Sequence, residues 1–317
     1  PRLLAKGNAA AIPVEMVASP IPYEAYTDEA EAIAFYVLNG VGGVLAVISF
    51  VVQSRDSAPY GRHYAAEKAW GPQIPQRLGH ILSDFPTGFV LFLLVFLLSR
   101  SLPKEAPNIV LAACWLAHYL HRGLIHPLVT SYSDKCTPLG ITLGGMFPNT
   151  LFSFLNAWFL ASADYEDVYV ADPRFIIGLV VFVVGFVVNR WADWKMKRLR
   201  DAQRAKAADA FTAGGPTTDN VVDAKQKAED QRQMARRKHY VIPHGGLYEL
   251  IACPNYFGEM TEWLGFAVAC WSLPGLFWWL FCCSTFVPRA QDNLRWYRTT
   301  FGDDYPGERR ALIPFLF

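Results

Sequence analysis

Charged side chains are scarce in this sequence. They make up 18% of the 317 residues, whereas 52% are hydrophobic and 15% are aromatic. A soluble domain of this length needs more polar side chains to cover its surface, so the composition argues against a soluble fold and favours a membrane protein. The formal net charge of +1 argues neither for nor against an acidic partner, and we expect no nucleic acid among the partners.

Several motifs are absent as well. No Gly-x-Gly-x-x-Gly follows a strand-like run and no Walker-type loop is present, which excludes a soluble dinucleotide-binding fold. The six cysteines show no spacing typical of zinc or redox sites, so we interpret them as packing residues and expect no metal. Residues 1–28 lack the basic-then-apolar pattern of a cleavable signal peptide, and we assign residues 1–30 to a segment outside the membrane.

Long apolar runs are the dominant feature that is present. A helix needs about 20 mostly apolar residues to cross a bilayer. Seven stretches are candidates: residues 32–52, 86–101, 108–129, 141–161, 173–194, 256–271 and 274–290. The sequence therefore predicts an all-α integral membrane protein in which seven transmembrane helices form one body over residues 31–317. Gly40, Gly42 and Gly43 lie within the first run and indicate close helix packing.

Charge is distributed unevenly between these runs. Residues 195–239 and the C-terminus are basic, whereas the connection at residues 164–172 is acidic. Because cytosolic loops carry an excess of Lys and Arg, we expect the basic segment and the C-terminus to face the cytosol and the N-terminus to face the lumen or the exterior. Residues 201–235 are polar and interrupted by Gly and Pro, so they are expected to form a flexible or partly helical cytosolic insertion.

Polar side chains form stripes at the cytosolic ends of three predicted helices. Ionisable groups at membrane depth are costly, so each is a candidate functional residue. The stripes, whose members share a helical face, are Asn189, Asp193, Lys197 and Arg200; Asn255, Glu259 and Glu262; and Arg289, Asn293 and Tyr297. Their carboxylates could hold ribose hydroxyls, and their Lys and Arg side chains could pair with phosphates. The alternative is that the stripes only satisfy one another as buried ion pairs and snorkelling side chains.

Two further polar positions stand in apolar surroundings. Residues 118–122 read His-Tyr-Leu-His-Arg, with Tyr119 and Arg122 one helical turn apart. Asp84 precedes Phe85-Pro86, and two interpretations of it are open. The local sequence favours a helix N-cap, whereas the carboxylate would lie inside a span if residues 75–82 are already helical.

The C-terminal third carries a long motif. Residues 240–263 read Tyr-Val-Ile-Pro-His-Gly-Gly-Leu-Tyr-Glu-Leu-Ile-Ala-Cys-Pro-Asn-Tyr-Phe-Gly-Glu-Met-Thr-Glu-Trp, and residues 304–306 and 311–317 read Asp-Tyr-Pro and Ala-Leu-Ile-Pro-Phe-Leu-Phe. These stretches closely resemble the signature of the steroid 5α-reductase family. The resemblance extends more weakly through the fifth predicted helix, residues 118–122 and residues 84–86, and leaves out the N-terminal region and residues 201–235.

The resemblance implies a seven-helix fold that encloses NADPH in a cavity facing the cytosol and admits a steroid or similar lipid from the bilayer. It implies a cofactor-binding set that coincides with the polar stripes: Arg122, Asn189, Asp193, Lys197, Arg200, Asn255, Glu259, Arg289, Asn293 and Tyr297. It also implies that Tyr119 and Asp84 hold the substrate ketone.

The activity that the resemblance implies is NADPH-dependent reduction of the Δ4 double bond of a 3-oxo steroid, with hydride going to the β-carbon of the enone. We expect the Tyr119 hydroxyl, assisted by a protonated Asp84, to donate to the developing enolate. The sequence does not identify the proton donor to the α-carbon. The expected location is the endoplasmic reticulum membrane in a eukaryote or the inner membrane in a bacterium, with no obligate protein partner.

Three positions depart from the family pattern. Asp84 stands where glutamate is usual, Lys197 stands where arginine is common, and Gln-Asp-Asn at residues 291–293 replaces a His-containing stretch. Two related enzymes stay open as alternatives. A trans-2-enoyl-CoA reductase shares Pro-Asn-Tyr but typically lacks the Phe-Gly-Glu that follows here, and a polyprenol reductase commonly has His at the position of Asn255. A seven-helix receptor or transporter would explain the spans but not the charged stripes.

Overall fold

The computed structural model describes residues 29–56, 58–59, 61–63, 70–99, 105–130, 136–212 and 240–317. Nearly all of the predicted N-terminal segment at residues 1–30, and residues 213–235 of the predicted insertion, lie outside the described residues. The remainder of that insertion is not a separate segment, because residues 201–212 continue the helix Pro173–Thr212.

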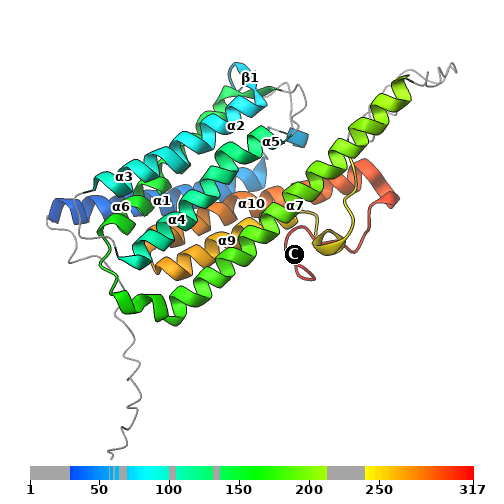
Figure 1. Cartoon of the computed structure of the whole chain (residues 1–317). Helices are drawn as coiled ribbons and strands as arrows, with labels where there is room; N and C mark the ends of the chain where they lie inside the picture. Colours follow the sequence, from blue (N-terminus) through cyan, green and yellow to red (C-terminus); the bar gives the residue numbers. More distant parts are fainter. Residues whose placement is uncertain are drawn as a thin grey trace, which may run out of the picture.

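Helices lie at all seven predicted positions, and they pack side by side in one elongated bundle from which the end of α7 projects (Figure 1). The elements are α1 (Glu29–Arg55), η1 (Gly61–His63), β1 (Gln73–Pro75), α2 (Gln76–Asp84), η2 (Phe85–Leu91), α3 (Phe92–Leu98), α4 (Ala106–Leu120), η3 (His121–Ile125), α5 (His126–Val129), β2 (Cys136–Pro138), α6 (Leu139–Ser162), η4 (Asp167–Ala171), α7 (Pro173–Thr212), η5 (Gly246–Glu249), α9 (Pro254–Cys270), α10 (Leu273–Phe301) and η6 (Gly302–Asp304). The two short strands pair antiparallel and lie next to the first residues of α2 and α6.

Three helical segments are long and apolar enough to cross a membrane by length and composition: Glu29–Arg55, Gln76–Leu98 and Pro173–Ala205. Their outer faces expose large apolar side chains, such as Val180 (58% exposed), Val183 (55%) and Val187 (57%) on α7. An apolar surface of this extent would be unfavourable in water and is favourable in lipid. The chain is therefore a helical membrane protein, and the number of seven crossings stays a prediction.

The predicted N-cap role of Asp84 is wrong. Asp84 is the last residue of α2, its side chain makes no capping hydrogen bond, and the helix continues through η2 into α3. Pro86 has no N–H to donate. Because η2 is a π-helix with a wider turn, the helix continues past this proline. The span therefore begins at Gln76 rather than at Pro86, and Asp84 lies within it.

Glycines bring α7 and α9 into backbone contact. A Cβ atom on Gly185 would lie 2.1 Å from the backbone nitrogen of Glu262, and one on Gly258 would lie 2.4 Å from that of Asn189. Gly178 and Gly265 make equally close contacts further along the same two helices. Small residues allow this approach between membrane helices, and its consequence is that the polar stripes of α7 and α9 face each other.

Aromatic rings fill the centre of the bundle. Trp115 of α4 is fully buried and lies 4.9 Å from Trp263 of α9 and 5.8 Å from Trp278 of α10, measured between ring centroids. The predicted packing role holds for Gly42 and Gly43, which touch the rings of Phe152 and Phe277, but Gly40 has no neighbour within 4 Å.

Candidate active site

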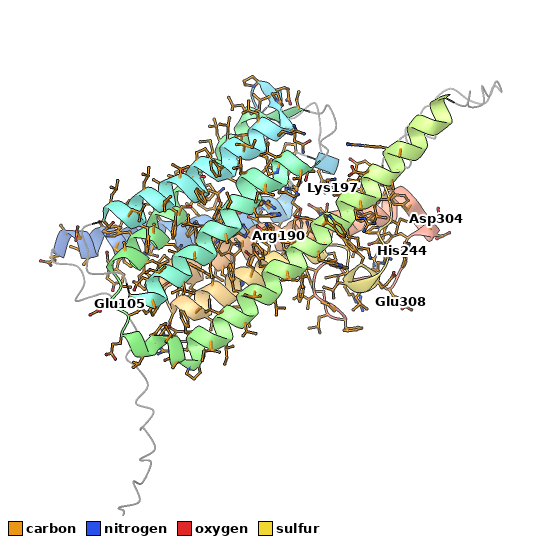
Figure 2. All side chains as sticks on the ribbon, in the orientation of Figure 1. Glu105, Arg190, Lys197, His244, Asp304 and Glu308 are labelled. Carbon is orange, nitrogen blue, oxygen red and sulfur yellow. The ribbon has the colours of Figure 1, made fainter. Side chains whose placement is uncertain are left out.

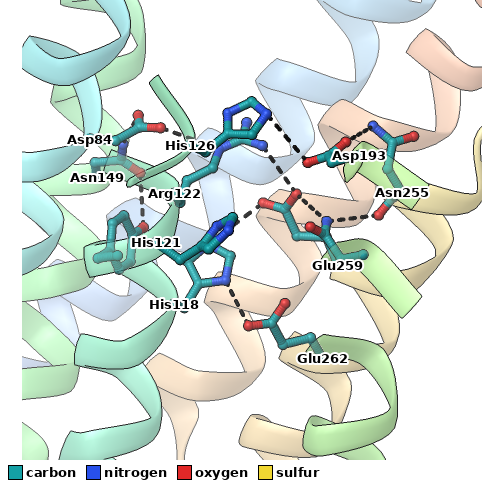
Figure 3. A network of polar contacts seen from close by, with 12 residues as sticks. Asp84, His118, His121, Arg122, His126, Asn149, Asp193, Asn255, Glu259 and Glu262 are labelled. Carbon is teal, nitrogen blue, oxygen red and sulfur yellow. Dashed lines mark hydrogen bonds and ion pairs between the residues drawn. The ribbon is translucent and has the colours of Figure 1, made fainter. Parts of the chain in front are cut away.

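A buried cluster of polar side chains crosses the bundle between α2, α4, α6, α7 and α9 (Figure 3). At one end, the Tyr119 hydroxyl of α4 donates to Oδ1 of Asn149 on α6 over 3.1 Å. The Nδ2 group of Asn149 then donates to Oδ1 of Asp84, also over 3.1 Å. Tyr119 is 2% exposed and Asp84 and Asn149 are each 9% exposed, so this end of the cluster is shielded from solvent.

The Tyr119 ring is held by close packing. A Cβ atom on Gly88 of η2 would lie 1.8 Å from the ring, so only glycine lets the ring rest on the η2 backbone. Trp115 stacks on Tyr119 with 5.3 Å between centroids and donates its indole N–H to the carbonyl oxygen of Gly88 over 3.0 Å. These contacts leave the phenol little rotational freedom.

Arg122 joins the two halves of the cluster. Its Nε donates to Oδ2 of Asp84 over 3.3 Å, and its Nη1 lies 3.5 Å from Oε2 of Glu259 on α9. Nε2 of His80 lies 3.2 Å from the same Asp84 oxygen. Donor groups of Arg122 and Asn149 point at the Asp84 carboxyl. Such surroundings stabilise an ionised carboxylate, whereas the sequence predicts a protonated Asp84 in an apolar site.

Amide and carboxylate groups of α7 and α9 form the other half. Nδ2 of Asn189 donates to the carbonyl oxygen of Asn255 over 2.9 Å and to Oε2 of Glu259 over 3.1 Å. Nδ2 of Asn255 donates to Oδ1 of Asp193 over 3.2 Å, and Nε2 of His126 lies 3.7 Å from Oδ2 of the same carboxylate. The structure thus brings seven of the predicted site residues into one network: Asp84, Tyr119, Arg122, Asn189, Asp193, Asn255 and Glu259.

The other predicted residues lie outside this network. Lys197 stands further along α7 than Arg190 (Figure 2) and pairs with Asp201 on its own helix, Nζ to Oδ2, over 2.7 Å. Arg200, one turn further on, is half-buried and lies near Tyr248. On α10, Arg289 donates to the carbonyl oxygen of Ala58 over 3.1 Å.

Asn293 and Tyr297 belong to the C-terminal end of α10. Oδ1 of Asn293 lies 2.9 Å from Nε2 of His63, and its Nδ2 donates to Sγ of Cys253 over 3.4 Å, one residue before α9 begins. Tyr297 stacks on Tyr305 with 5.0 Å between centroids. Burial raises the pKa of Tyr305 to about 12, so this phenol is neutral at physiological pH.

The C-terminal residues fix where α9 starts. Arg309, 1% exposed, donates to the carbonyl oxygen of Pro243 over 2.8 Å and to Oε2 of Glu249 over 3.1 Å. Hydrogen bonds from the Gly245 backbone and from Arg309 lower the pKa of Glu249, so this carboxylate stays charged. A parallel β-bridge between Ile251 and Arg310 also joins the C-terminal residues to the segment before α9. The long motif and the chain end therefore hold Asn255 in place together.

Sequence reasoning missed several members of the cluster. Asn149 follows Pro148 in the apolar run 141–161, which contains no ionisable residue, and the search for polar stripes started from ionisable residues. His118 and Glu262 were noticed, but no pairing between them was foreseen. Nδ1 of His118 lies 2.7 Å from Oε1 of Glu262, both side chains are at most 2% exposed, and Arg190 approaches the second Glu262 oxygen to 3.9 Å.

The fold and the buried polar cluster define a helical membrane protein with an internal polar site. The family described as 3-oxo-5-alpha-steroid 4-dehydrogenase matches residues 136–211 and 221–317. Residues 201–211 and 221–235 are thus inside the match, although the sequence resemblance left them out.

Three relatives show the extent of the similarity. The chain is 35% identical to steroid 5-alpha-reductase DET2 of Arabidopsis thaliana, over 82% of this chain and 88% of the relative. It is 33% identical to 3-oxo-5-alpha-steroid 4-dehydrogenase 1 of Macaca fascicularis (81% and 84%) and 31% identical to the Homo sapiens protein of the same name (84% and 90%). The chain therefore belongs to the 3-oxo-5-alpha-steroid 4-dehydrogenase family, which confirms the resemblance inferred from its motifs.

Proposed function

We propose that this protein uses NADPH to reduce the Δ4 double bond of a 3-oxo steroid. One observation carries the proposal beyond family membership. Tyr119, the predicted ketone donor, and the predicted cofactor residues Glu259, Asn189 and Asn255 are parts of one hydrogen-bonded cluster inside an apolar bundle. A carbonyl donor and a nucleotide-binding group must lie close together if hydride is to reach an enone whose oxygen is held by that donor.

The cluster suits one part of NADPH and the projecting end of α7 suits another. In the described cluster the carboxylates of Asp84, Asp193, Glu259 and Glu262 outnumber the guanidinium groups of Arg122 and Arg190. An acidic excess favours hydroxyl and amide donors over phosphates. The fully buried Oδ1 of Asn189 has no hydrogen-bond partner among the described residues, so it can accept from a ribose hydroxyl or a carboxamide.

The phosphate groups of NADPH require cationic side chains rather than carboxylates. Lys197 and Arg200 follow Asp193 along the same face of α7 at intervals of one turn, so they would hold phosphate groups while Asp193 and Glu259 hold ribose. Arg289, Asn293 and Tyr297 complete the proposed set from α10. The Lys197–Asp201 pair is local and partly exposed, and a pair of this kind stabilises a helix by only about 0.3 to 0.5 kcal/mol. A phosphate can therefore replace Asp201 as the partner of Lys197.

NADPH, when bound, supplies the hydride that is added to the β-carbon of the enone. The Tyr119 hydroxyl donates a hydrogen bond to the ketone oxygen, where negative charge develops as the β-carbon is reduced. Asp84 stabilises this end of the site through Asn149 and Arg122. Addition of a proton to the α-carbon completes the reduction. The product is a saturated 3-oxo steroid.

The proposed setting is a membrane with the cofactor side and the C-terminus in the cytosol. The basic residues at the projecting end of α7 support this orientation, because basic segments stay on the cytosolic side. Seven spans, and an endoplasmic reticulum or bacterial inner-membrane location, belong to the same proposal. No described feature favours the enoyl-CoA or polyprenol alternatives over a steroid.

The direct test is an assay of substrate class. Membranes containing the protein are incubated with NADPH and either a panel of 3-oxo-Δ4 steroids, a trans-2-enoyl-CoA series or a polyprenol, and the products are identified. We expect a saturated 3-oxo product from at least one steroid. Reduction of an enoyl-CoA or a polyprenol with no steroid reduced would replace the proposed function by the corresponding alternative.

A further inference from the structure

Asn149 occupies a position between Tyr119 and Asp84 that neither the family motifs nor the polar stripes indicated. Its side chain uses both polar atoms. Oδ1 accepts from the Tyr119 hydroxyl, and Nδ2 donates to Oδ1 of Asp84 and to the carbonyl oxygen of Ser83, each over 3.1 Å. These are three of the four hydrogen bonds that an asparagine amide can make in such a site.

The orientation of this amide is determined by its neighbours. Rotating the amide by 180° would turn its oxygen towards the Asp84 carboxylate and the Ser83 carbonyl oxygen, which are both acceptors. Nδ2 must therefore face Asp84, and Oδ1 must face Tyr119. Since Oδ1 can only accept, the phenol has to act as the donor, and its proton points away from Asp84.

We propose that Asn149 is a positioning residue that keeps the Tyr119 proton available for the substrate ketone. The amide oxygen of Asn149 accepts the Tyr119 hydrogen bond as a ketone oxygen would, so the hydroxyl is already held as a donor before the steroid binds. When the steroid binds, the hydroxyl turns its proton from Asn149 Oδ1 to the ketone oxygen, which is a neutral acceptor of the same kind. This inference rests on the proposed function.

Such a residue is needed because the Asp84 carboxylate is a strong acceptor that competes with the ketone for the Tyr119 proton. The described side chains show no direct hydrogen bond between Tyr119 and Asp84; Asn149 lies between them. A hydrogen bond to an ionised carboxylate is roughly twice as strong as one to a neutral acceptor. Without Asn149, the phenol could donate to Asp84 instead, and its proton would no longer be directed at the ketone.

The experiment compares Asn149→Ala with Tyr119→Phe, separately and together, in purified protein. We expect Asn149→Ala to lower kcat about tenfold, which corresponds to one misdirected hydrogen bond, and to leave the KM for NADPH unchanged. In the Tyr119→Phe background, which has no phenol proton to direct, the same substitution should cause no further loss.

Asn156 provides a matched control on the same helix. It is fully buried, and its Nδ2 donates only to the backbone oxygens of Phe152 and Pro274. Asn156→Ala should lower the melting temperature but leave the kcat of the folded fraction near that of the wild type. If Asn149→Ala does not accumulate, Asn149→Ser, whose side chain is too short to reach both partners, is put through the same comparison.

Two results would overturn the inference. One is a kcat like that of the wild type in the folded Asn149 variant. The other is a loss that multiplies with that of Tyr119→Phe, because Asn149 would then act independently of the phenol proton. A wild-type protein that reduces no 3-oxo-Δ4 steroid is a different outcome, since it would contradict the proposed function before any variant is compared.

Discussion

The polar residues inside the bundle and those at the projecting end of α7 differ in how they are held. Inside, Asn189 is fully buried, Glu259 is 5% exposed, and each bonds to a different helix from its own. At the end of α7, the Lys197 side chain is 29% exposed and pairs with Asp201 four residues along the same helix. The interior residues are thus positioned by contacts between helices, whereas Lys197 is held by a local and partly exposed pair.

The largest effect on stability should come from breaking the buried hydrogen bond between His118 and Glu262. Glu262→Ala removes the partner of His118 and leaves Arg190 without its nearest carboxylate. Removing one partner of a buried hydrogen bond leaves the other group unsatisfied, which typically costs about 1 to 3 kcal/mol of unfolding free energy. We expect a clearly lower melting temperature in detergent, a milder effect from Glu262→Gln, and no effect from Glu308→Gln, which alters an exposed carboxylate (Figure 2). Equal stability of all three variants would show that the pair does not hold the interior together.

Tyr119→Phe tests the chemistry of the interior. The substitution keeps the ring that packs on Gly88 and Trp115 and deletes only the hydroxyl. Loss of one donor to a developing oxyanion typically lowers kcat by about 10²- to 10³-fold. NADPH affinity, measured by fluorescence titration, should be unchanged. Turnover like that of the wild type would remove Tyr119 from the mechanism.

Substitutions at the end of α7 should change cofactor preference rather than stability. NADPH differs from NADH by a 2′-phosphate, and a preference for it requires cationic partners. We expect Lys197→Ala or Arg200→Ala to raise the KM for NADPH about tenfold and to change the KM for NADH much less, as expected for one charge-assisted contact of about 1.5 kcal/mol.

Arg198 is the matched control for this prediction. It lies on the same stretch of α7, is exposed, and stacks over Trp194 at 4.7 Å. Arg198→Ala should leave the ratio of the two KM values unchanged. If all three substitutions shift the ratio equally, the cations act only through general charge, and the Lys197 face is not the phosphate site.

The smallest effect is expected where the family match is interrupted. Residues 212–220 lie between the two matched segments. Deleting residues 213–220 and joining the ends with a short Gly/Ser linker should therefore leave kcat and KM within about twofold, because the cost of closing a connection changes slowly with its length. Deleting residues 201–211 should lower activity more, since this stretch is inside the family match and continues α7 directly after Arg200. Equal tolerance of both deletions would contradict a role for the end of α7.

Much of this architecture could be predicted because apolar length and helical spacing are local properties. The length of the apolar runs predicts the seven helices, and helical spacing predicts the shared face of residues such as Asn189 and Asp193. Pairing between helices cannot be predicted in this way, because it depends on which backbones approach closely. The contact of Gly185 and Gly258 with the opposite helix is what places Asn189 beside Glu259, and no spacing within one helix indicates it.

Two errors have a specific physical origin. Asp84 before Phe85-Pro86 has the composition of a helix start, but the π turn of η2 lets the helix pass the proline, a possibility that local propensity does not include. Asn149 escaped notice because no ionisable residue shares its apolar run, residues 141–161, although a buried amide needs hydrogen-bond partners as well. Polar residues of every kind within apolar runs are therefore better candidates than ionisable residues alone.

The most direct test of the central claim follows the hydrogen atoms of the reaction. The purified protein is given a 3-oxo-Δ4 steroid and NADPH deuterated at both positions of the nicotinamide C4, in ordinary water, and the product is examined by mass spectrometry and NMR. The account predicts a saturated 3-oxo steroid with a single deuterium on the former β-carbon and a solvent hydrogen on the α-carbon. Deuterium on a carbinol carbon with the double bond intact, or no transfer at all, would contradict it.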